Sequence, residues 1–574
     1  MTSSADVALP MRVRTGPASR GLGSASWIAL ALVLVALVAN PLLHLASISF
    51  SDTKGGWTLA NYATAFSSKR YLVAYGNSLL LGLCVAVLCA LLGVPIAWAV
   101  SRTDMPCKTL VRMLVLATFV TPPFLGATAW ILLAGPNAGW INVGFKALFG
   151  VDWAPLNIYS FAGVVFVLAI YSFPYVFTFT TAALDNISSE MEDAAGILGS
   201  GRLRTMRRIT LPLVLPAILA ASIVTYLDAV SIISSTIMVA LPARINLIPL
   251  QLWEFFSYPL RVEVAAAYSV PMLLIAVAMF WAQKRLLGRK GYVSLTGKGG
   301  QRRPIVLGPW RWVLLAWCMF VLTLSIAAPY LVLLQGAFSK AWTKGLAWAN
   351  LSFANFAYLF ASYNEAPRAI VNTFLYSGLA ATFAVALSLG IAYATTRRLV
   401  PGASALSALA YTPAVVPGLI LAIGFYASYA VPPFQLAGTG ALLVIAFTTR
   451  FLPTSFASAS SAMASVNQEM EEAARILGGS RLLALRRILA PLLKRSLAGA
   501  WLLVFILSAR EVSSALFLYG PRSRTMSVYF FDLAENGRFE VLCALGVVLL
   551  LTMLVFVFIG QAIVGRDFMT RRES

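Results

Sequence analysis

Long apolar stretches alternate with short polar connections along the whole chain of 574 residues. Each apolar stretch holds about twenty residues, enough to cross a hydrocarbon core of roughly 30 Å as a helix. Backbone groups in lipid must be hydrogen-bonded within their own segment, and the alternating ten-residue segments of a strand barrel do not occur. The pattern predicts an all-α polytopic membrane protein with twelve spans at residues 26–48, 73–101, 113–134, 158–183, 212–240, 263–283, 312–335, 369–396, 404–430, 438–463, 496–518 and 539–563.

Composition supports this prediction and charge orients it. The chain is 60% hydrophobic and 11% charged, roughly half the charged fraction of a soluble protein. The net charge of +22 does not indicate nucleic-acid binding, because the basic residues lie in short connections rather than on one soluble domain. With both termini in the cytoplasm, 29 of the 43 Lys and Arg residues fall in cytoplasmic segments. This positive-inside bias predicts cytoplasmic termini.

A basic segment divides the chain in two. The predicted parts are a cytoplasmic tail (1–25), a first transmembrane domain (26–283), a basic cytoplasmic linker (284–311), a second transmembrane domain (312–563) and a cytoplasmic tail (564–574). The start of the chain resembles a signal peptide, with three arginines before an apolar run. That run continues past Pro41 to Phe50, which favours a retained first span.

The two domains repeat each other. Asn77 begins the second span as Asn372 begins the eighth, and the fourth spans carry Pro174 and Pro453 at the same place. The segment from Ile96 to Arg102 likewise matches the segment from Ile391 to Arg397. Six spans in each half give the repeats the same orientation. This predicts a pseudo-twofold axis along the membrane normal, with a pathway between the halves.

The most detailed repeat lies in the predicted cytoplasmic loops between spans four and five of each half. The first copy, residues 190–212, reads EMEDAAGILGSGRLRTMRRITLP, and the second, residues 469–491, reads EMEEAARILGGSRLLALRRILAP. Shared apolar composition explains similarity between lipid-facing segments, but it does not explain this detail in a polar loop.

These loops resemble the EAA motif of ABC importer permeases: an acidic residue and two alanines, then a glycine, then Ile-x-Leu-Pro. The matching residues are Asp193, Ala194, Ala195 and Gly199 in the first copy and Glu472, Ala473, Ala474 and Gly478 in the second. Two positions depart from the motif, since Asp193 replaces the usual Glu and Ala490 the usual Leu. The small alanines allow close approach of another protein, and each glycine suits a left-handed helix terminus.

The resemblance implies the type I ABC importer permease fold and its partners. In that family, the loop helix docks into an ATP-hydrolysing subunit. The expected partners are therefore two copies of an ABC ATPase, a periplasmic or lipid-anchored substrate-binding protein and the bilayer of the bacterial inner membrane. ATP would be used by the partner, with no cofactor bound by this chain. An amphipathic helix lying on the bilayer is the structural alternative for these loops.

Residues for catalysis or metal binding are scarce. His44 is the only histidine, and the five cysteines lack metal-ligand spacing. The glycine-rich segment at residues 291–299 departs from a phosphate loop in its spacing and lacks the final Ser or Thr. No catalytic or metal residues are therefore expected, and the chain is not expected to be an enzyme.

The substrate is suggested only by resemblance. The segment from Ala509 to Tyr519, the Leu-Ala-Glu-Asn-Gly-Arg stretch from Leu533, and the linker at residues 296–299 resemble the fused permeases of ferric-iron uptake. Thiamine, 2-aminoethylphosphonate, polyamine and sulfate permeases share the architecture and remain alternatives. A secondary transporter of the 6+6 type is the alternative class, since it fits the span count but not the EAA copies.

Four ionisable residues fall within predicted spans: Asp228, Arg450, Arg510 and Glu511. Each costs roughly 2.5–3.5 kcal/mol on insertion and needs a partner or a polar path. Arg450 and Glu511 lie at depths that differ by roughly 8 Å, within reach of an arginine side chain. They are predicted to form either a structural clamp or part of the translocation path, and Asp228 has no evident partner.

Overall fold

The computed structural model describes residues 27–52, 56–186, 195, 197–257, 259–288, 304–345, 347–361, 365–476 and 478–564. Within these ranges the regular structure is helical, apart from three isolated β-bridges. The prediction of an all-α fold is confirmed.

Ten helices in the described ranges are long and apolar enough to cross a membrane. They are Trp27–Ser49 (containing η1, Val35–Ala39, and α2, Asn40–Ser49), α4 (Lys69–Arg102), α8 (Phe161–Asn186), Met206–Ser231 (η2, Met206–Thr210, and α11, Leu211–Ser231), α14 (Val262–Gly288), Trp310–Ala337 (α15, Trp310–Leu322; η3, Thr323–Ala327; α16, Ala328–Ala337), α18 (Ala366–Thr396), α21 (Gly440–Ala464), Leu485–Ala509 (η6, Leu485–Leu489, and α24, Ala490–Ala509) and α27 (Phe539–Val564).

Two of the predicted spans are bent helix pairs. The span expected at 113–134 consists of α5 (Lys108–Val120) and α6 (Pro123–Ala134), bent by 99°. The span expected at 404–430 consists of α19 (Ala403–Val415) and α20 (Gly418–Tyr429), bent by 111°. Pro122 and Pro417 lie at the breaks, where a missing backbone N–H and the ring clash interrupt a helix. Counting each pair as one span gives the twelve that the sequence predicts.

Two further predicted spans end earlier than expected. The segment 212–240 breaks between α11 and α12 (Ser234–Val239), and the segment 496–518 breaks between α24 and α25 (Ser513–Leu518). Arg510 and Glu511 therefore lie in the break after α24 and not inside a continuous helix. The apolar pattern runs across both breaks, which is why the sequence alone did not indicate them.

Wide π-helical turns recur before prolines. The segments η1, η2, η3 and η6 each end two residues before a proline, at Pro41, Pro212, Pro329 and Pro491. A proline lacks a backbone donor and its ring collides with the carbonyl four residues earlier, and a widened turn relieves that collision. These helices consequently continue through their prolines.

The remaining short helices lie in the connections. They are α3 (Ala60–Ser67), α7 (Trp140–Phe149), α10 (Arg202–Thr205), α13 (Ile248–Phe256), η4 (Trp342–Lys344), η5 (Trp348–Asn350), α17 (Ala354–Leu359), α22 (Glu469–Ile476), α23 (Arg481–Ala484) and α26 (Met526–Glu535).

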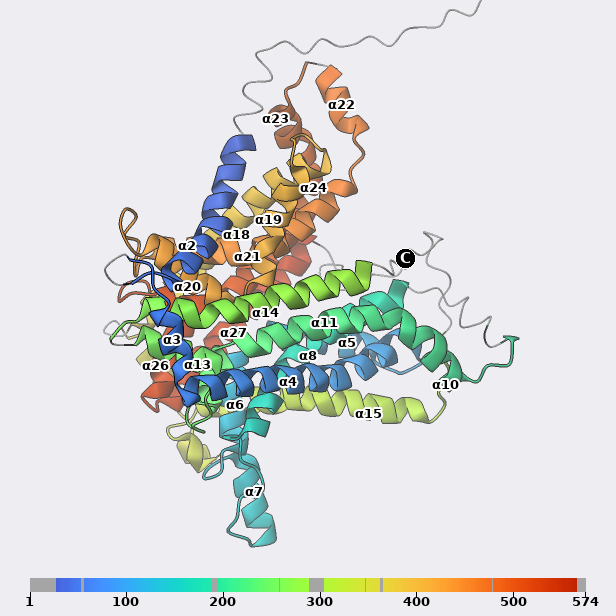
Figure 1. Cartoon of the computed structure of the whole chain (residues 1–574). Coiled ribbons are helices and arrows are strands. Elements are labelled where there is room, and N and C mark those ends of the chain that lie inside the picture. Colours follow the sequence, from blue (N-terminus) through green and yellow to red (C-terminus); the bar gives the residue numbers. More distant parts are fainter. Residues whose placement is uncertain are drawn as a thin grey trace, which may run out of the picture.

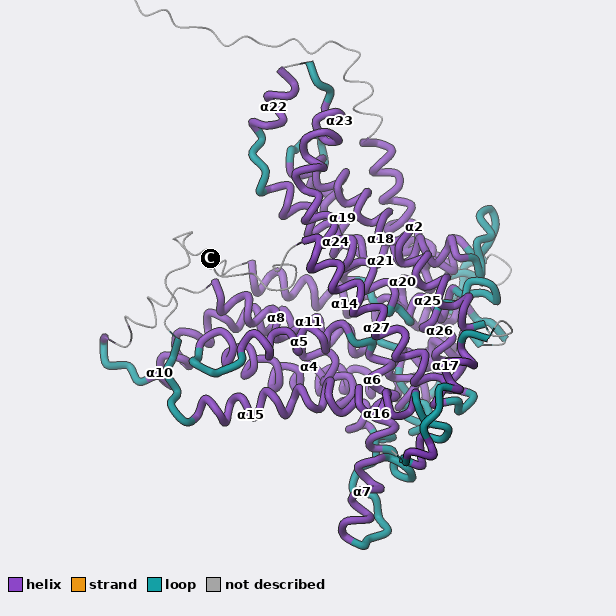
Figure 2. Tube along the Cα trace, turned by 180° about the vertical axis from the view of Figure 1, so that it is seen from behind, coloured by secondary structure: helices purple, strands orange, loops and turns teal. Residues whose placement is uncertain are grey.

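The two halves form two bundles that diverge from a shared base. Helices α4, α8 and α11 contact one another in the first half, and α18, α21 and α24 do so in the second. Figure 1 shows the first bundle ending near α10 and the second ending near α22, and Figure 2 shows the same divergence from behind. The same three-helix contacts therefore occur in both halves, in agreement with the predicted repeat.

The first helix of each half packs on the other half. Helix α2 contacts α20, and the Tyr429 hydroxyl donates to the Ala36 carbonyl at 2.5 Å. In the opposite direction, α15 contacts α5 and α16 contacts α6, with the hydroxyls of Thr121 and Tyr330 2.7 Å apart. Each bundle therefore holds one helix of its partner, which ties the halves together.

The repeated Asn-Ser/Thr pair at the start of α4 and α18 has one structural role in both halves. The Asn77 amide donates to the Asn246 carbonyl at 3.0 Å, and Ser78 Oγ accepts from the Ile248 backbone N–H at 2.8 Å.

In the second half, Asn372 donates to the carbonyls of Arg522 and Arg524 at 3.0 and 2.9 Å, and Thr373 Oγ1 accepts from the Met526 N–H at 2.7 Å. Each pair thus fixes the segment that leads into α13 or α26.

Candidate functional site

The repeated loops at residues 190–212 and 469–491 are called the first and second coupling loops below. The second coupling loop contains α22, which ends in a tight left-handed turn. Gly478 has φ +87°, and the Gly479 N–H donates to the Ala474 carbonyl at 2.9 Å. This six-to-one hydrogen bond around a left-handed glycine is a Schellman C-cap. A side chain at position 478 would be strained by the backbone alone, because no described atom lies within 4 Å of a Cβ built there.

The first coupling loop contains the same left-handed turn at its motif glycine. Gly199 has φ +78°, and the Ser200 N–H donates to the Ala195 carbonyl at 2.9 Å. Ala195 is buried. Asp193 and Ala194, which the motif also predicts, lie outside the described residues.

Both loops expose apolar side chains next to polar ones. Ile197 and Leu198 are 87% and 86% exposed in the first loop, and Ile476 is 85% exposed in the second. Glu472 and Ala473, the predicted motif residues, are exposed on α22. A nearly bare isoleucine beside an exposed carboxylate is suited to a protein interface with an apolar centre and a basic partner.

The sequence reasoning did not single out Glu471, which anchors α22. Its side chain is buried, accepts a hydrogen bond from the Tyr393 hydroxyl, and lies 3.5 Å from Arg397 Nε. Arg397 also donates to the Val466 carbonyl at 2.9 Å. The signal was present, since Glu occurs at this place in both copies of the loop and Arg102 and Arg397 occupy matching places in the halves.

Arg102 has a role similar to that of Arg397. It is buried at the end of α4 and donates to the Leu184 carbonyl at 3.0 Å, near the C-terminal end of α8. A guanidinium at a helix C-terminus satisfies free carbonyls and complements the helix dipole. Both halves therefore brace the start of the coupling loop on the end of the second long helix.

Charged side chains gather where the two bundles meet. Arg450 Nε of α21 lies 3.2 Å from Glu511 Oε2, so the two side chains that were predicted to lie within reach of each other are in contact. Glu511 Oε1 also accepts from the Ser514 N–H at 3.0 Å, which caps the start of α25. A Cβ at Gly418 would collide with the Arg450 guanidinium, so the glycine gives this side chain its route past α20.

Arg510 crosses from the second half to the first. Its guanidinium donates to the Phe119 carbonyl and lies 4.9 Å from the centre of the Phe119 ring. Phe119 precedes the break between α5 and α6, where the bend leaves carbonyls without helical partners. Tyr175 of α8 also interacts electrostatically with Arg510.

Asp228 completes this charge cluster. It lies near the end of α11 and interacts electrostatically with both Arg450 and Arg510, as well as with Glu511. The sequence offered no partner for Asp228, because the two arginines near it come from the other half. The cluster thus joins two acidic and two basic groups, which lowers the cost of each in a membrane interior.

The first half has no charged counterparts at these positions. Aligning the repeats on Pro174 and Pro453 places Tyr171 at the position of Arg450. The same alignment places Ser231 and Ile232 at the positions of Arg510 and Glu511.

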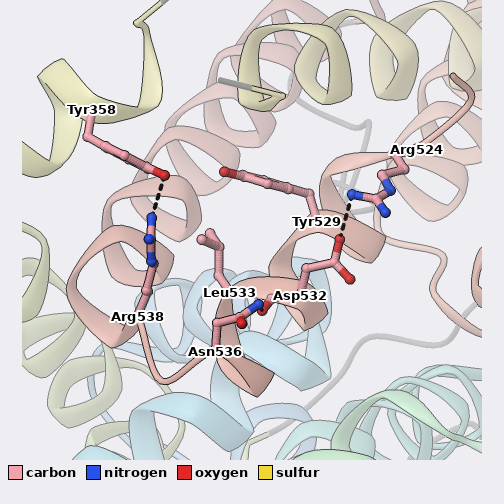
Figure 3. Close-up of a pocket in the computed structure, with 7 residues that line it drawn as sticks. All are labelled: Tyr358, Arg524, Tyr529, Asp532, Leu533, Asn536 and Arg538. Carbon is pink, nitrogen blue, oxygen red and sulfur yellow. Dashed lines mark hydrogen bonds and ion pairs between the residues drawn. The ribbon is translucent and has the colours of Figure 1, made fainter. Parts of the chain in front are cut away.

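A cavity of about 420 Å³ opens at the end of the second bundle opposite α22, lined by Tyr358, Arg524, Tyr529, Asp532, Leu533, Asn536 and Arg538. Figure 3 shows Arg538 hydrogen-bonded to the Tyr358 hydroxyl and Arg524 paired with Asp532. Arg524 Nη1 lies 3.1 Å from Asp532 Oδ2. Burial raises the pKa of Asp532 above its ordinary value, and Arg524 opposes this change. Sequence reasoning noted the stretch from Leu533 but not this cavity.

Within the described residues, no group of three or more His, Cys, Asp or Glu side chains is arranged to hold a metal ion. Cys107 is the exposed cysteine among the five, and Cys89, Cys318 and Cys543 are buried.

Comparison with known proteins agrees with this geometry. Residues 90–292 and 384–566 match the family described as binding-protein-dependent transport system inner membrane component. The ferric transport system permease protein FbpB of Actinobacillus pleuropneumoniae is 25% identical over 85% of this chain and 71% of its own length. A putative ferric transport system permease protein FbpB 1 of Haemophilus influenzae is 24% identical over 88% of this chain and 79% of its own.

A shorter relative matches one half. A probable molybdenum ABC transporter permease protein of Haloferax volcanii is 29% identical over 44% of this chain and 87% of its own length. The two family matches contain the two coupling loops and most of the long helices described above. This chain belongs to the family of binding-protein-dependent transport system inner membrane components and is a multi-pass ABC importer permease of the inner membrane.

Proposed function

We propose that this chain forms the translocation pathway of a ferric-iron importer, with an ABC ATPase docked on each coupling loop and a binding protein on the opposite face. The observation that carries the proposal is the pair of matching Schellman-capped loops at the ends of the two diverging bundles. Each loop offers exposed apolar side chains for docking. Two equivalent loops call for two copies of the ATPase, and ATP is bound by those subunits rather than by this chain.

Ferric iron is the substrate that the relatives favour. Both FbpB proteins align with most of the fused chain, whereas the molybdenum permease aligns with 44% of it. The same role for thiamine, 2-aminoethylphosphonate, a polyamine or sulfate is the alternative.

The charge cluster supports a pathway at the meeting point of the bundles. Arg450 and Glu511 form the structural clamp of this proposal, and Asp228 and Arg510 link it to the first half. Because acidic and basic groups balance, the cluster offers polar contacts without a strong net charge that would hold an ion in place. A conducting site must bind its cargo weakly enough to release it.

The cavity bordered by Arg524 and Asp532 is suited to the binding protein. It lies at the opposite end of the chain's long helices from the coupling loops and carries both charges and tyrosine hydroxyls. Mixed polar groups around a recess are typical of transient interfaces.

Cysteine labelling tests the proposed orientation with cytoplasmic termini. A cysteine at Lys344 should react with an impermeant reagent in intact cells, and one at Ser480 only after permeabilisation. Labelling of Ser480 from outside would rule out docking of a cytoplasmic ATPase.

Reconstitution tests the transport function. The purified chain is placed in proteoliposomes with its ATPase, and the binding protein is supplied loaded with radioactive Fe³⁺. We expect iron uptake that requires ATP and both partners, and none with molybdate or sulfate. Uptake driven by an ion gradient without the ATPase would identify a secondary transporter, and ATP-dependent uptake of another cargo would replace iron alone.

A further inference from the structure

A hairpin made of one helix and an irregular returning segment projects from the first half between α6 and α8. It consists of α7 and the segment that returns from it, residues 140–156, and is called the α7 hairpin below. In Figure 1 the hairpin lies crosswise to α4 and α15 and extends away from the bundle, and Figure 2 shows the same projection. It precedes α8, whereas the first coupling loop follows α8, so the two lie at opposite ends of that 26-residue helix.

The polar groups that close the base of the α7 hairpin are hydrogen-bonded within it, whereas Asp152 is exposed and the buried Trp140 Nε1 has no hydrogen-bond partner in the described residues. Asn142 is fully buried, and its amide donates to the carbonyls of Gly135 and Leu156 at 2.9 and 2.8 Å. Its side-chain oxygen accepts from the Leu156 N–H at 3.0 Å. Ile158 N–H donates to the Ala134 carbonyl at 3.2 Å and closes the base. Such internal closure is what a backbone needs in a low-dielectric environment.

The outer surface of the α7 hairpin is apolar on most sides. Leu148, Phe149 and Trp153 are 77%, 61% and 60% exposed, and Ile141 and Val143 are exposed as well. Phe145 packs between Phe149 and Trp153, with ring centres 4.6 and 5.4 Å away. A hairpin this apolar is unfavourable in water, since each large side chain left exposed forgoes the free energy that its burial would contribute.

The surroundings indicate what covers this surface. The hairpin is continuous with α6 and α8, which belong to the membrane-embedded bundle, and it lies across the long helices rather than along them. Its aromatic residues and Lys146 in the last turn of α7 match the composition of segments at the membrane interface. A lysine there can extend its ammonium to the headgroups while its methylenes stay in the apolar layer.

We propose that the α7 hairpin is an interfacial membrane anchor, inserted into the lipid leaflet opposite the coupling loops. The lipid acyl chains and headgroups of that leaflet are its partner. The anchor belongs to the first half alone, because the matching connection of the second half, residues 430–439, is short and contains no helix. It braces the first bundle against the bilayer beside the break between α5 and α6.

A fluorophore on the hairpin tests this anchor. A cysteine at Phe149, in a background with Cys84→Ala and Cys107→Ser, is labelled with an environment-sensitive dye, and the purified chain is placed in lipid nanodiscs. We expect a blue-shifted emission that lipids bearing a shallow spin label quench and aqueous iodide does not. The matched control is a cysteine at Asn536, which is exposed between α26 and α27 on the same face and should show the reverse.

Each outcome decides the proposal. Quenching of position 149 by lipid without any partner protein supports the anchor. Quenching by iodide in nanodiscs overturns it, whether or not the signal becomes protected when the binding protein is added. Gel filtration of each labelled variant establishes that the chain is folded, and a Leu148→Cys variant, labelled in the same way, repeats the measurement at a second exposed position.

Discussion

The two halves of this permease are alike at their ends and different in the middle. Both coupling loops contain a Schellman cap at a left-handed glycine. At the opposite end of each half, an asparagine and a hydroxyl hold the segment that leads into α13 or α26. At the level of the charge cluster, however, the repeats differ. The residues of the first half that correspond to Arg450, Arg510 and Glu511 in the alignment are uncharged. The connection before the fourth long helix also differs, with the α7 hairpin in the first half only.

The difference follows from how many times each task is performed. In the function proposed above, an ATPase subunit docks on each half, so each half would need its own capped loop. The same proposal has a single pathway between the halves, which one set of charges would be enough to line. Charged residues in a membrane are costly, so a second set would lower stability without adding a contact.

The cluster also depends on both halves being present. Arg510 reaches Phe119 of the first half, and Asp228 of the first half interacts with two arginines of the second. Together with the exchanged first helices, this makes the pseudo-twofold interface the place where an asymmetric chemistry is built on a symmetric frame.

The largest expected effect on uptake comes from the repeated caps. Gly199→Val and Gly478→Val each force a branched side chain into a left-handed conformation, at roughly 1–2 kcal/mol or more per site. Each single variant should reduce ATP-dependent uptake about tenfold, as a coupling loss near 1.4 kcal/mol implies. The double variant should lose uptake altogether, measured in proteoliposomes with the ATPase and binding protein.

A neighbouring glycine provides the matched control for these caps. Gly201 lies in the first coupling loop, has no left-handed φ, and has open space around a Cβ built there. Gly201→Ala should therefore retain uptake close to that of the unchanged chain. Full uptake by the double variant would remove both loops from the coupling surface.

The charge cluster gives the second effect, and here the halves should differ. Arg450→Ala or Glu511→Ala leaves a charge unpaired, which typically costs roughly 3–5 kcal/mol. Tyr171→Phe, at the matching place of the first half, removes a buried hydroxyl that has no hydrogen-bond partner in the described residues and should not lower the free energy of unfolding. Thermal unfolding in nanodiscs measures all three.

Neutral replacement of both partners separates a clamp from a substrate contact. The double variant Arg450→Met with Glu511→Gln should regain part of the lost stability, since no charge remains unpaired. If the single variants unfold at the normal temperature but fail to transport, Arg450 contacts the cargo instead. Stable and fully active single variants would remove both roles.

The sequence predicted the helices well because lipid imposes a strong, simple pattern. The predicted spans at 369–396 and 438–463 differ from α18 and α21 by three residues or fewer at each end. The breaks at Pro122 and Pro417 were not predicted, because a proline in a membrane helix is equally compatible with a widened turn, as at Pro212 and Pro491. Tertiary neighbours decide between these outcomes, and the sequence does not list them.

The candidate sites divide in the same way. The glycines of the coupling loops could be predicted because a left-handed helix end is a local property. The partners of Asp228 and Arg510 could not, because they lie on helices of the other half. The contact of Glu471 with Arg397 and Tyr393 could be predicted only in part. The segments that it joins each repeat in both halves, but they lie far apart in the sequence.

A third prediction concerns this contact of Glu471. Glu471→Gln keeps the shape of the side chain and an oxygen that can accept from Tyr393, but it removes the charge-assisted contact with Arg397, worth about 2 kcal/mol. The amides of α22 should then exchange with solvent roughly thirtyfold faster while the unfolding temperature stays nearly constant. Exposed Glu469, paired only with Asn467 of its own turn in the described residues, is the control, and Glu469→Gln should change exchange little. Equal exchange in both variants would show that α22 is held by other contacts.

The smallest effect tests the tethers at the outer ends. Asn372→Ala removes donors to two carbonyls and should cost about 2 kcal/mol, whereas Asn77→Ala removes a donor to one and should cost about 1 kcal/mol. Ser78→Ala and Thr373→Val each remove one acceptor for a backbone N–H, at 2.8 and 2.7 Å, and should cost equal amounts. Unfolding in nanodiscs of the four variants measures these differences. Equal losses for the hydroxyl pair with unequal losses for the asparagines would show one inherited tether that the second half has strengthened, and the reverse order for the asparagines would contradict it.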